Sequence, residues 1–441
     1  MDGNPPFAQK RRMSSYLMGW PPARRVFACV EGTAPPAFAQ AVLALLAGVA
    51  LGWLAWGEGR APALAALLPV LVALSRSRTH AFLLGLGYTV ALLRHTAAFI
   101  GSWFDDSLMI GAAAVLAYGL ISGAVWCLGW SRSARPWRKS LAVVVAWTVA
   151  LLPPATVGLP GHPLIAWGAI APGLGWVGVA LALAVPAGLV WWLAEHRLRP
   201  WQTAAVLGAF LASLGVVGIL QFVPGSSYGP ATVAVNTAWG KLDGVDDVLR
   251  RVESMGQMSK QLAQQEKPAT VIWPESILGN YDPVLHPVLD IALLKAARAS
   301  GQTQIIGMDL PTKDKHWENA AVAFYPDGRS ARAVARQPAP LSLWRPWRET
   351  NSFVADWTAS NVLTLSNTMR AAFIFCYEEY LPVLYLLNEA QGKVDMYVAV
   401  TNTWAAQSPV AAEIQTQHSL GMARLFGRPY VKAENRPLKV E

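Results

Sequence analysis

The chain has 441 residues, of which 54% are hydrophobic, and it contains 20 tryptophans. This composition is too apolar for an ordinary soluble protein, and the length is sufficient for two domains. The net charge of +9 belongs to the first half: residues 1–223 carry 15 Lys and Arg against 6 Asp and Glu, whereas residues 224–441 carry 21 of each sign. The second half therefore lacks the basic stripe of a nucleic-acid-binding domain, and direct binding of nucleic acid is not expected.

The first 37 residues are polar, basic and proline-containing. They lack the short apolar core and small-residue cleavage site that are typical of a secretory signal peptide. We therefore interpret residues 1–37 as a cytosolic basic tail.

Seven apolar runs follow the tail, and most approach the roughly 20 residues that a helix needs to cross a bilayer. They are residues 38–56, 61–74, 81–100, 108–128, 141–157, 174–193 and 204–222. The run 61–74 is short, so a re-entrant or half-buried helix is an alternative there, and counts of six or eight spans stay open. Residues 38–222 are therefore predicted to form a transmembrane domain of about seven helices.

The charges between these runs predict an orientation. If the tail is cytoplasmic and the spans alternate, the inside segments carry 13 Lys and Arg, and the outside segments carry only Arg60 and Arg94. Positive residues gather on the cytoplasmic side of membrane proteins. The chain is thus expected to be a multi-pass protein of a bacterial inner membrane, with the segment after residue 222 in the periplasm.

A turn-rich linker at 223–230 leads into a domain at 231–441 where strand and helix patterns alternate. Strands are predicted at 231–235, 271–273, 304–308, 320–325, 332–336, 362–365, 371–375, 396–400 and 430–433, and helices at 245–264, 284–299, 381–389 and 411–426. The turn at 326–328 predicts a hairpin. This alternation is typical of a layered α/β domain.

Two of these strands end at residues with reactive side chains. Cys376 follows the strand 371–375, and Glu275 follows the strand 271–273. A cysteine attacks well only as a thiolate, so it needs a base or a positive field to lose its proton. If the fold brings the two strand ends together, Glu275 is a candidate for that base. Alternatively, Cys376 is a buried, inert thiol and Glu275 caps a helix after Pro274.

Four segments of this domain occur in the order and spacing of a known family. They are Trp-Pro-Glu-Ser at 273–276, Cys-Tyr-Glu at 376–378, Thr-Asn-Thr-Trp at 401–404, and the segment 418–430. These segments resemble the carbon–nitrogen hydrolase (nitrilase) superfamily. Membrane spans followed by such a domain resemble apolipoprotein N-acyltransferase, and the run 336–346 looks closer to the TraB family of plasmid conjugal transfer proteins.

The resemblance implies a four-layer α-β-β-α sandwich and a Glu-Lys-Cys triad. Glu275 would be the general base and Cys376 the nucleophile that forms a thioester. The residues that would support this site are Glu378, Tyr377, Asn402 and Trp404. The resemblance also implies membrane lipid as a partner, a phospholipid as acyl donor, a protein or amine as acceptor, and contact with the conjugation machinery. The sequence has no metal-ligand spacing and no glycine-rich phosphate loop, so no metal or cofactor is expected.

The sequence departs from the family at two places. The lysine of the triad corresponds to Ala335, with Arg336 beside it; an arginine could stabilise an oxyanion but stays charged and is a poor proton shuttle. The chain also stops at Glu441, soon after the last matching segment, so the sheet is expected to be truncated.

Two functions therefore stay open. One is a cysteine-dependent acyltransferase or amidase that works through a thioester at the membrane surface. The other is a catalytically impaired membrane accessory factor in plasmid conjugation. A transporter is a weaker third interpretation, because it would leave the second domain unexplained.

Overall fold

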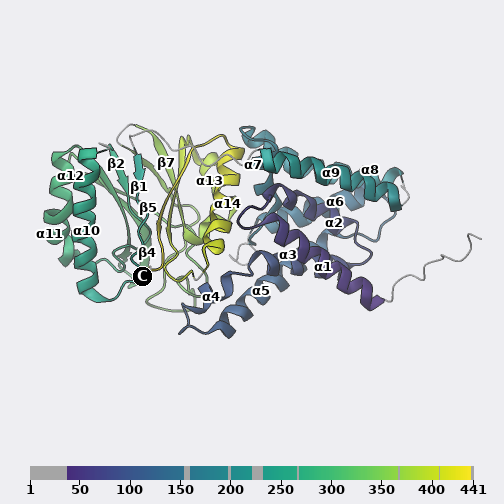
Figure 1. Ribbon diagram of the computed structural model, residues 1–441, viewed down its shortest axis with the longest axis horizontal. Coiled ribbons are helices and arrows are strands. Elements are labelled where there is room, and N and C mark those ends of the chain that lie inside the picture. Colours follow the sequence, from purple (N-terminus) through teal and green to yellow (C-terminus); the bar gives the residue numbers. More distant parts are fainter. Residues whose placement is uncertain are drawn as a thin grey trace, which may run out of the picture.

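The computed structural model describes residues 37–152, 159–196, 200–220, 232–265, 268–365, 368–406 and 408–438. The predicted linker at 223–230 and the predicted tail, except for residue 37, lie outside these ranges. Figure 1 shows a helical part on one side and an α/β part on the other, with α14 between them.

The helical part runs from residue 37 to residue 220. Its helices are α1 (Ala37–Ala55), η1 (Pro62–Leu67), α2 (Leu68–Ala73), α3 (Arg78–Leu92), α4 (Thr96–Gly101), α5 (Leu108–Trp126), η2 (Cys127–Gly129), α6 (Pro136–Leu151), η4 (Pro163–Ala166), α7 (Trp167–Ile170), α8 (Gly175–His196) and α9 (Pro200–Leu220). Within the described residues, three helices are long and apolar enough to cross a membrane, namely Ala37–Ala55, Leu108–Gly129 and Gly175–His196. The predicted number of seven spans is therefore not shown.

The difference arises because an apolar run need not be one continuous helix. The run 81–100 contains α3, which has 15 residues, followed by a break and the short helix α4. At about 1.5 Å per residue, α3 is roughly 22 Å long, which is shorter than the roughly 30 Å hydrocarbon core. The run 61–74 forms only the short apolar helix Pro62–Ala73, in line with the alternative considered for it.

Glycines allow the long helices to pack closely. A Cβ on Gly48 of α1 would lie 2.1 Å from the carbonyl oxygen of Leu84, and a Cβ on Gly52 would lie 2.3 Å from that of Tyr88. Both carbonyls belong to α3, so the backbones of α1 and α3 touch along two turns. Small residues at helix contacts are the common means of close helix packing in membranes.

The α/β part contains two sheets. The first has the order β1 (Thr232–Ala234), β2 (Thr270–Ile272), β3 (Thr303–Pro311), β4 (Trp317–Phe324) and β5 (Ser330–Val334), and the second has the order β6 (Val362–Thr364), β7 (Arg370–Phe375), β8 (Met396–Asn402) and β9 (Tyr430–Asn435). Strands β1, β2 and β3 are parallel, as are β7, β8 and β9. The antiparallel pairs are β3 with β4 and β4 with β5 in the first sheet, and β6 with β7 in the second. Each strand predicted for 231–441 is present within a few residues of its predicted ends.

Helices cover the outer face of each sheet. The first sheet carries α10 (Gly244–Gln265), η5 (Pro283–Leu285), α11 (His286–Leu289), the π turn η6 (Asp290–Leu294) and α12 (Lys295–Ala299), and the second carries η7 (Cys376–Tyr380), α13 (Pro382–Gln391) and α14 (Pro409–Leu425). Val271 packs in the apolar cluster under α10, whereas its neighbour Ile272 packs between the two sheets against Phe375. The layers therefore follow the predicted order α-β-β-α (Figure 1).

Helix α14 joins the α/β part to the helical part. A Cβ on Gly168 of α7 would lie 1.9 Å from the carbonyl oxygen of Gly421, so the backbones of α7 and α14 touch. Gln417 accepts a hydrogen bond from the amide of Gly57 (3.0 Å) and donates one to the carbonyl of the same residue. The α/β part thus rests on the end of the helical part where α1 finishes.

Candidate active site

Cys376 lies directly after β7 and begins the 3-10 helix η7. Its φ angle is +30°, a backbone conformation that residues with a side chain rarely adopt. Gln415 of α14 donates to the carbonyl of Cys376 at 3.0 Å, and its amide nitrogen lies 3.7 Å from the sulfur. The backbone amide of Asn402, at the end of β8, also donates to the sulfur. The sharp turn thus holds the thiol among hydrogen-bond donors.

Glu275 lies just after β2, and its side chain is buried. Its carboxylate accepts a hydrogen bond from Nδ2 of Asn319 on β4. Glu275 and the thiol of Cys376 also shift each other's pKa, so the two side chains are close neighbours. The structure therefore brings together the two residues that the sequence analysis placed at separate strand ends, one from each sheet.

Burial raises the pKa of Glu275 to about 8. The hydrogen bond from Asn319 opposes this rise, the negative charges of Asp309 and Glu378 add to it, and the Cys376 thiol opposes it. A carboxyl group with this pKa is mostly protonated at pH 7 and becomes an available base just above neutrality. Such a value is suited to general acid–base chemistry near neutral pH.

Burial also raises the pKa of the Cys376 thiol well above its ordinary value, and the charge of Glu275 raises it further. The donors Asn402 and Gln415 lower the pKa of the thiol, whereas Glu379 raises it. The resting site is therefore a protonated thiol beside an acid. The thiolate would form only when Glu275 takes the proton.

The backbone of β3 fixes the position of Glu275. A Cβ on Gly307 would lie 2.1 Å from the carbonyl oxygen of Pro274 and 2.6 Å from the Cα of Glu275. The next residues of the same turn are held by β3 as well, because Ser276 donates to Asp309 at 2.7 Å. Only glycine at 307 lets the turn lie this close to the strand.

We expect Gly307→Ala to lower the free energy of unfolding by about 1–3 kcal/mol, because an added methyl group must push the 274–275 turn away. The displaced carboxylate would also change the pH dependence of Cys376 alkylation by iodoacetamide. Gly188→Ala in α8 is the matched control, since a Cβ there meets nothing within 4 Å. Wild-type stability and an unchanged alkylation profile in Gly307→Ala would contradict this account.

Two of the predicted supporting residues, Glu378 and Asn402, link the strand ends near the thiol by hydrogen bonds. Glu378 is fully buried and accepts hydrogen bonds from the backbone amides of Gln337 (2.8 Å) and Phe375 (3.0 Å). It therefore ties the end of β7 to the segment that follows β5. Asn402 accepts a side-chain hydrogen bond from Asn435 at 3.0 Å, which links the ends of β8 and β9.

Tyr377 and Trp404 face the helical part. The hydroxyl of Tyr377 lies 3.5 Å from that of Tyr118 on α5. The ring of Trp404 makes an edge contact with Trp103, with the ring centres 5.5 Å apart. Side chains of α5 and of the segment between α4 and α5 thus contact two of the predicted supporting residues.

Arg336 differs from the expectation that it enters the cleft with Glu275 and Cys376. Its guanidinium donates to the carbonyl of Ala359 at 2.8 Å, to Asn388 at 2.9 Å, and to Gln391. These contacts hold the side chain against α13, because Ala335 takes the place in the core between the sheets. The structure thus pairs the guanidinium with α13, and the role of Arg336 in place of the family lysine stays a prediction.

A lysine outside the predicted site residues lies on β9. Lys432 of β9 has a side chain that is only 10% exposed, and its Nζ lies 3.1 Å from the Oε1 of Glu379. It also donates to Thr416 of α14 at 3.1 Å. The signal that could have revealed it is the alternation of Tyr430, Lys432 and Glu434, which gives a predicted strand one polar face.

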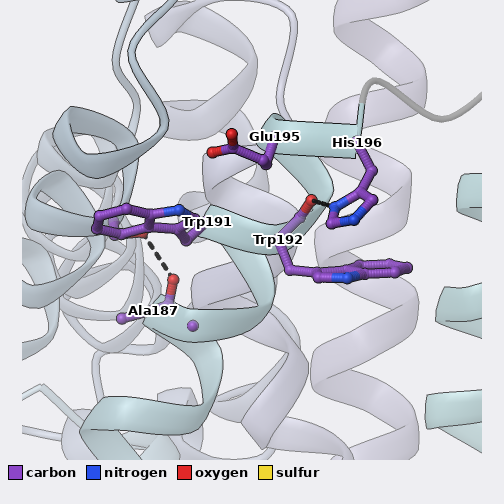
Figure 2. A pocket seen from close by; sticks show the side chains of 7 residues that line it. Ala187, Trp191, Trp192, Glu195 and His196 are labelled. Atoms are coloured by element: carbon purple, nitrogen blue, oxygen red, sulfur yellow. Dashed lines mark hydrogen bonds between the residues drawn. The ribbon is translucent and has the colours of Figure 1, made fainter.

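A hollow of about 340 Å³ lies away from the thiol, in the helical part. It is lined by Ser140, Ala187, Gly188, Trp191, Trp192, Glu195 and His196. Two of its polar groups are already paired. Ser140 donates to the carbonyl of Ala187, and His196 bonds to that of Trp192 (Figure 2). In the described ranges, no group of three His, Cys, Asp or Glu could hold a metal ion.

Comparisons with known proteins identify relatives over most of the chain. No family model matches. The chain is 27% identical over 403 residues to "Probable conjugal transfer protein TraB" of Sinorhizobium fredii, covering 90% of this chain and 98% of that protein. It is 27% identical over 415 residues to "Conjugal transfer protein TraB" of Agrobacterium fabrum, covering 90% and 93%. The chain thus has homologues named TraB conjugal transfer protein.

Solved structures of the nitrilase superfamily are structural neighbours of this chain. An amidase from Nesterenkonia sp. is 17% identical, with a TM-score of 0.35, and the match covers 46% of this chain and 74% of that one. A carbon-nitrogen hydrolase from Helicobacter pylori is 13% identical, with a TM-score of 0.34, covering 46% and 72%.

Proposed function

We propose that this chain, a homologue of proteins named conjugal transfer protein TraB, is a membrane-anchored enzyme that transfers acyl groups through a thioester on Cys376. The observation that carries the proposal is that the Cys376 thiol and the buried carboxylate of Glu275 lie close enough to shift each other's pKa. A nucleophile within reach of a base whose pKa lies near neutrality is the minimum that covalent acyl transfer requires.

The proposed reaction has two halves. Glu275 takes the thiol proton while the sulfur attacks the carbonyl carbon of an ester or amide, and a tetrahedral intermediate forms. The bond from that carbon to the leaving oxygen or nitrogen then breaks, and Glu275 returns the proton to the leaving group. In the second half, an amine or a water attacks the thioester and loses its proton to Glu275, the carbon–sulfur bond breaks, and Glu275 returns the proton to the sulfur of Cys376. An amine acceptor makes the protein an N-acyltransferase, and water with an amide donor makes it an amidase.

The membrane setting supports a lipid acyl donor and a site on the periplasmic face. Helix α14 contacts Cys376 through Gln415 and the helical part through Gln417, so the thiol lies near the end of that part where α1 finishes. At about 1.5 Å per residue, the opposite end of α1 is roughly 28 Å away. A phospholipid donor, a protein or amine acceptor and an inner-membrane location are parts of this proposal.

A second function is favoured by one specific observation. Arg336 is directed to α13 and Ala335 is buried between the sheets, so the position that matches the family lysine supplies no cation to the thiol. A site impaired in this way would suit an accessory factor that binds components of the conjugation machinery without catalysis.

The test is to trap the acyl-enzyme. The full chain is reconstituted into vesicles of phosphatidylethanolamine and phosphatidylglycerol, quenched in acid, and examined by intact-protein and peptide mass spectrometry. We expect the mass of one fatty acyl group on the peptide that contains Cys376, which hydroxylamine removes because thioesters are cleaved by it. Cys127, also a free cysteine, is an internal control. An unmodified Cys376 peptide across a set of lipid and amide donors would favour the accessory role.

A further inference from the structure

Cys376 and Glu379 lie on the same face of the 3-10 helix η7. That helix begins at Cys376 and ends at Tyr380, and residues three apart eclipse each other in a 3-10 helix. Glu379 is completely buried, so its charge has little water around it. Its carboxylate accepts hydrogen bonds from Ser419 (2.6 Å) and Tyr430 (3.0 Å). A negative charge in this place opposes ionisation of the thiol next to it.

Lys432 meets this charge from β9, two strands away from β7 in the same sheet. In the register of the second sheet, Ile374 pairs with Ala399, and Ala399 pairs with Lys432. Lys432 therefore projects from the same face as Ile374, two residues before Cys376. Its Nζ reaches Glu379 at 3.1 Å and lies 4.0 Å from Glu434. It also donates to Thr416, the neighbour of Gln415, which contacts the sulfur.

We propose that Lys432 is a positioning residue that makes Cys376 ionisable by neutralising the charge of Glu379 beneath the thiol. The proposal rests on the proposed role of Cys376 as nucleophile, and it assigns to β9 the positive charge that Arg336 does not deliver. Lys432 touches Glu379 rather than the reacting atoms, so it acts through that carboxylate. Removing one partner of a buried ion pair leaves the charge of the other buried without compensation.

The other charged side chains that act directly on the thiol or on Lys432 are acidic. Those that act on Cys376 or Lys432 are Glu275 after β2, Glu379 of η7, and Glu434 of β9, and Glu413 of α14 feels the charge of Lys432. The neighbouring side chain of α14 at the sulfur is the neutral Gln415. Arg436 pairs with Glu434, so in the described part of the chain Lys432 is the cation that contacts Glu379, and its loss would leave that carboxylate without its ion-pair partner.

The experiment measures the rate of Cys376 alkylation by iodoacetamide against pH, in the full chain in detergent, with peptide mass spectrometry to separate Cys376 from Cys29 and Cys127. We expect Lys432→Met to move the midpoint of the profile upward by about one pH unit or more, which slows alkylation about tenfold at a fixed pH below it. Lys432→Arg, which keeps the charge, should restore most of the wild-type rate. Glu379→Gln should move the midpoint downward, because it removes the opposing charge.

A matched control breaks a second ion pair. Arg428 contacts Glu389 of α13 at 3.1 Å, and neither residue acts on the thiol, so Arg428→Met should leave the midpoint unchanged. An unchanged midpoint in folded Lys432→Met would overturn the proposal. If Lys432→Met does not fold, Glu379→Gln decides alone: a lower midpoint supports the proposal, and an equal or higher one overturns it. The readout needs no acyl donor, so it can fail or succeed independently of the acyl-transfer proposal.

Discussion

Glu275→Gln should slow acylation of Cys376 by about 10²–10⁴-fold, the range that a positioned general base contributes. Glutamine preserves the size of the side chain and still offers an oxygen to Asn319, which donates to Glu275 in the wild type. It cannot accept the thiol proton. The measurement is the single-turnover rate of acyl-enzyme formation by rapid quench and mass spectrometry. An acylation rate within threefold of wild type would show that another group removes the proton.

The wild-type rate should also rise with pH. Since the pKa of Glu275 is raised to about 8, the carboxyl is protonated and unable to act as a base at pH 6, and it ionises as the pH approaches and passes 8. The acylation rate should therefore increase by about tenfold per pH unit on the acid side of this pKa. In Glu275→Gln this rise should disappear.

The same pKa predicts a stability difference with the opposite trend. The folded protein keeps the Glu275 proton up to about pH 8, whereas an unfolded glutamate loses it near pH 4.5. Between these values the folded state holds more protons, so stability falls as pH rises. Glu275→Gln lacks this titrating group. The difference in melting temperature, Glu275→Gln minus wild type, should therefore increase as the pH is raised from 5 to 8.5. A constant difference would mean that the carboxyl is not shifted as described.

The strands that hold the site were predictable from the sequence because their signals are local. Apolar runs such as 371–375 stop abruptly at polar residues, and that stop is where a buried strand ends. Both Glu275 and Cys376 occupy such ends. Their meeting required only that parallel strands of two facing sheets finish at the same edge of the sandwich.

The direction of Arg336 was not predictable in the same way. Strand alternation decides which of two neighbours faces the core, and the structure gives the core to Ala333 and Ala335. Arg336 then points away from the core between the sheets and satisfies its guanidinium at α13. Assigning the role of the family lysine at position 335 to the neighbouring Arg336 ignores this alternation, because neighbours on a strand face opposite sides.

The partnership of Lys432 with Glu379 depends on long-range packing. The two residues are 53 positions apart in sequence and meet only because β9 lies beside β8 and η7 folds back under α14. The alternation of residues identifies a polar face on the strand 430–433, but it does not identify which element packs on that face. The difference between the predicted and the observed number of membrane-capable helices has a similar origin, because hydropathy counts apolar residues and does not report whether a helix is continuous.

Cys376→Ala should abolish acyl-enzyme formation and leave the fold intact. Removing the sulfur eliminates the atom that carries the acyl group, so no residual route to the thioester exists. The thiol is only partly exposed, and its loss should cost about 1 kcal/mol of folding free energy, as for ordinary single substitutions. The measurements are intact-protein mass after incubation with lipid vesicles and a melting curve in detergent.

The same variant separates the two proposed functions in a conjugation assay. In a donor strain that depends on this chain for plasmid transfer, an acyltransferase predicts that Cys376→Ala fails to support transfer, whereas an accessory factor predicts normal transfer. Gly421→Leu is the complementary variant, because its side chain would collide with Ile165, whose carbonyl oxygen would lie 2.6 Å from a Cβ at position 421. It should separate α14 from α7 and impair either function. Normal transfer with Cys376→Ala and failure with Gly421→Leu would therefore assign the role to binding rather than catalysis.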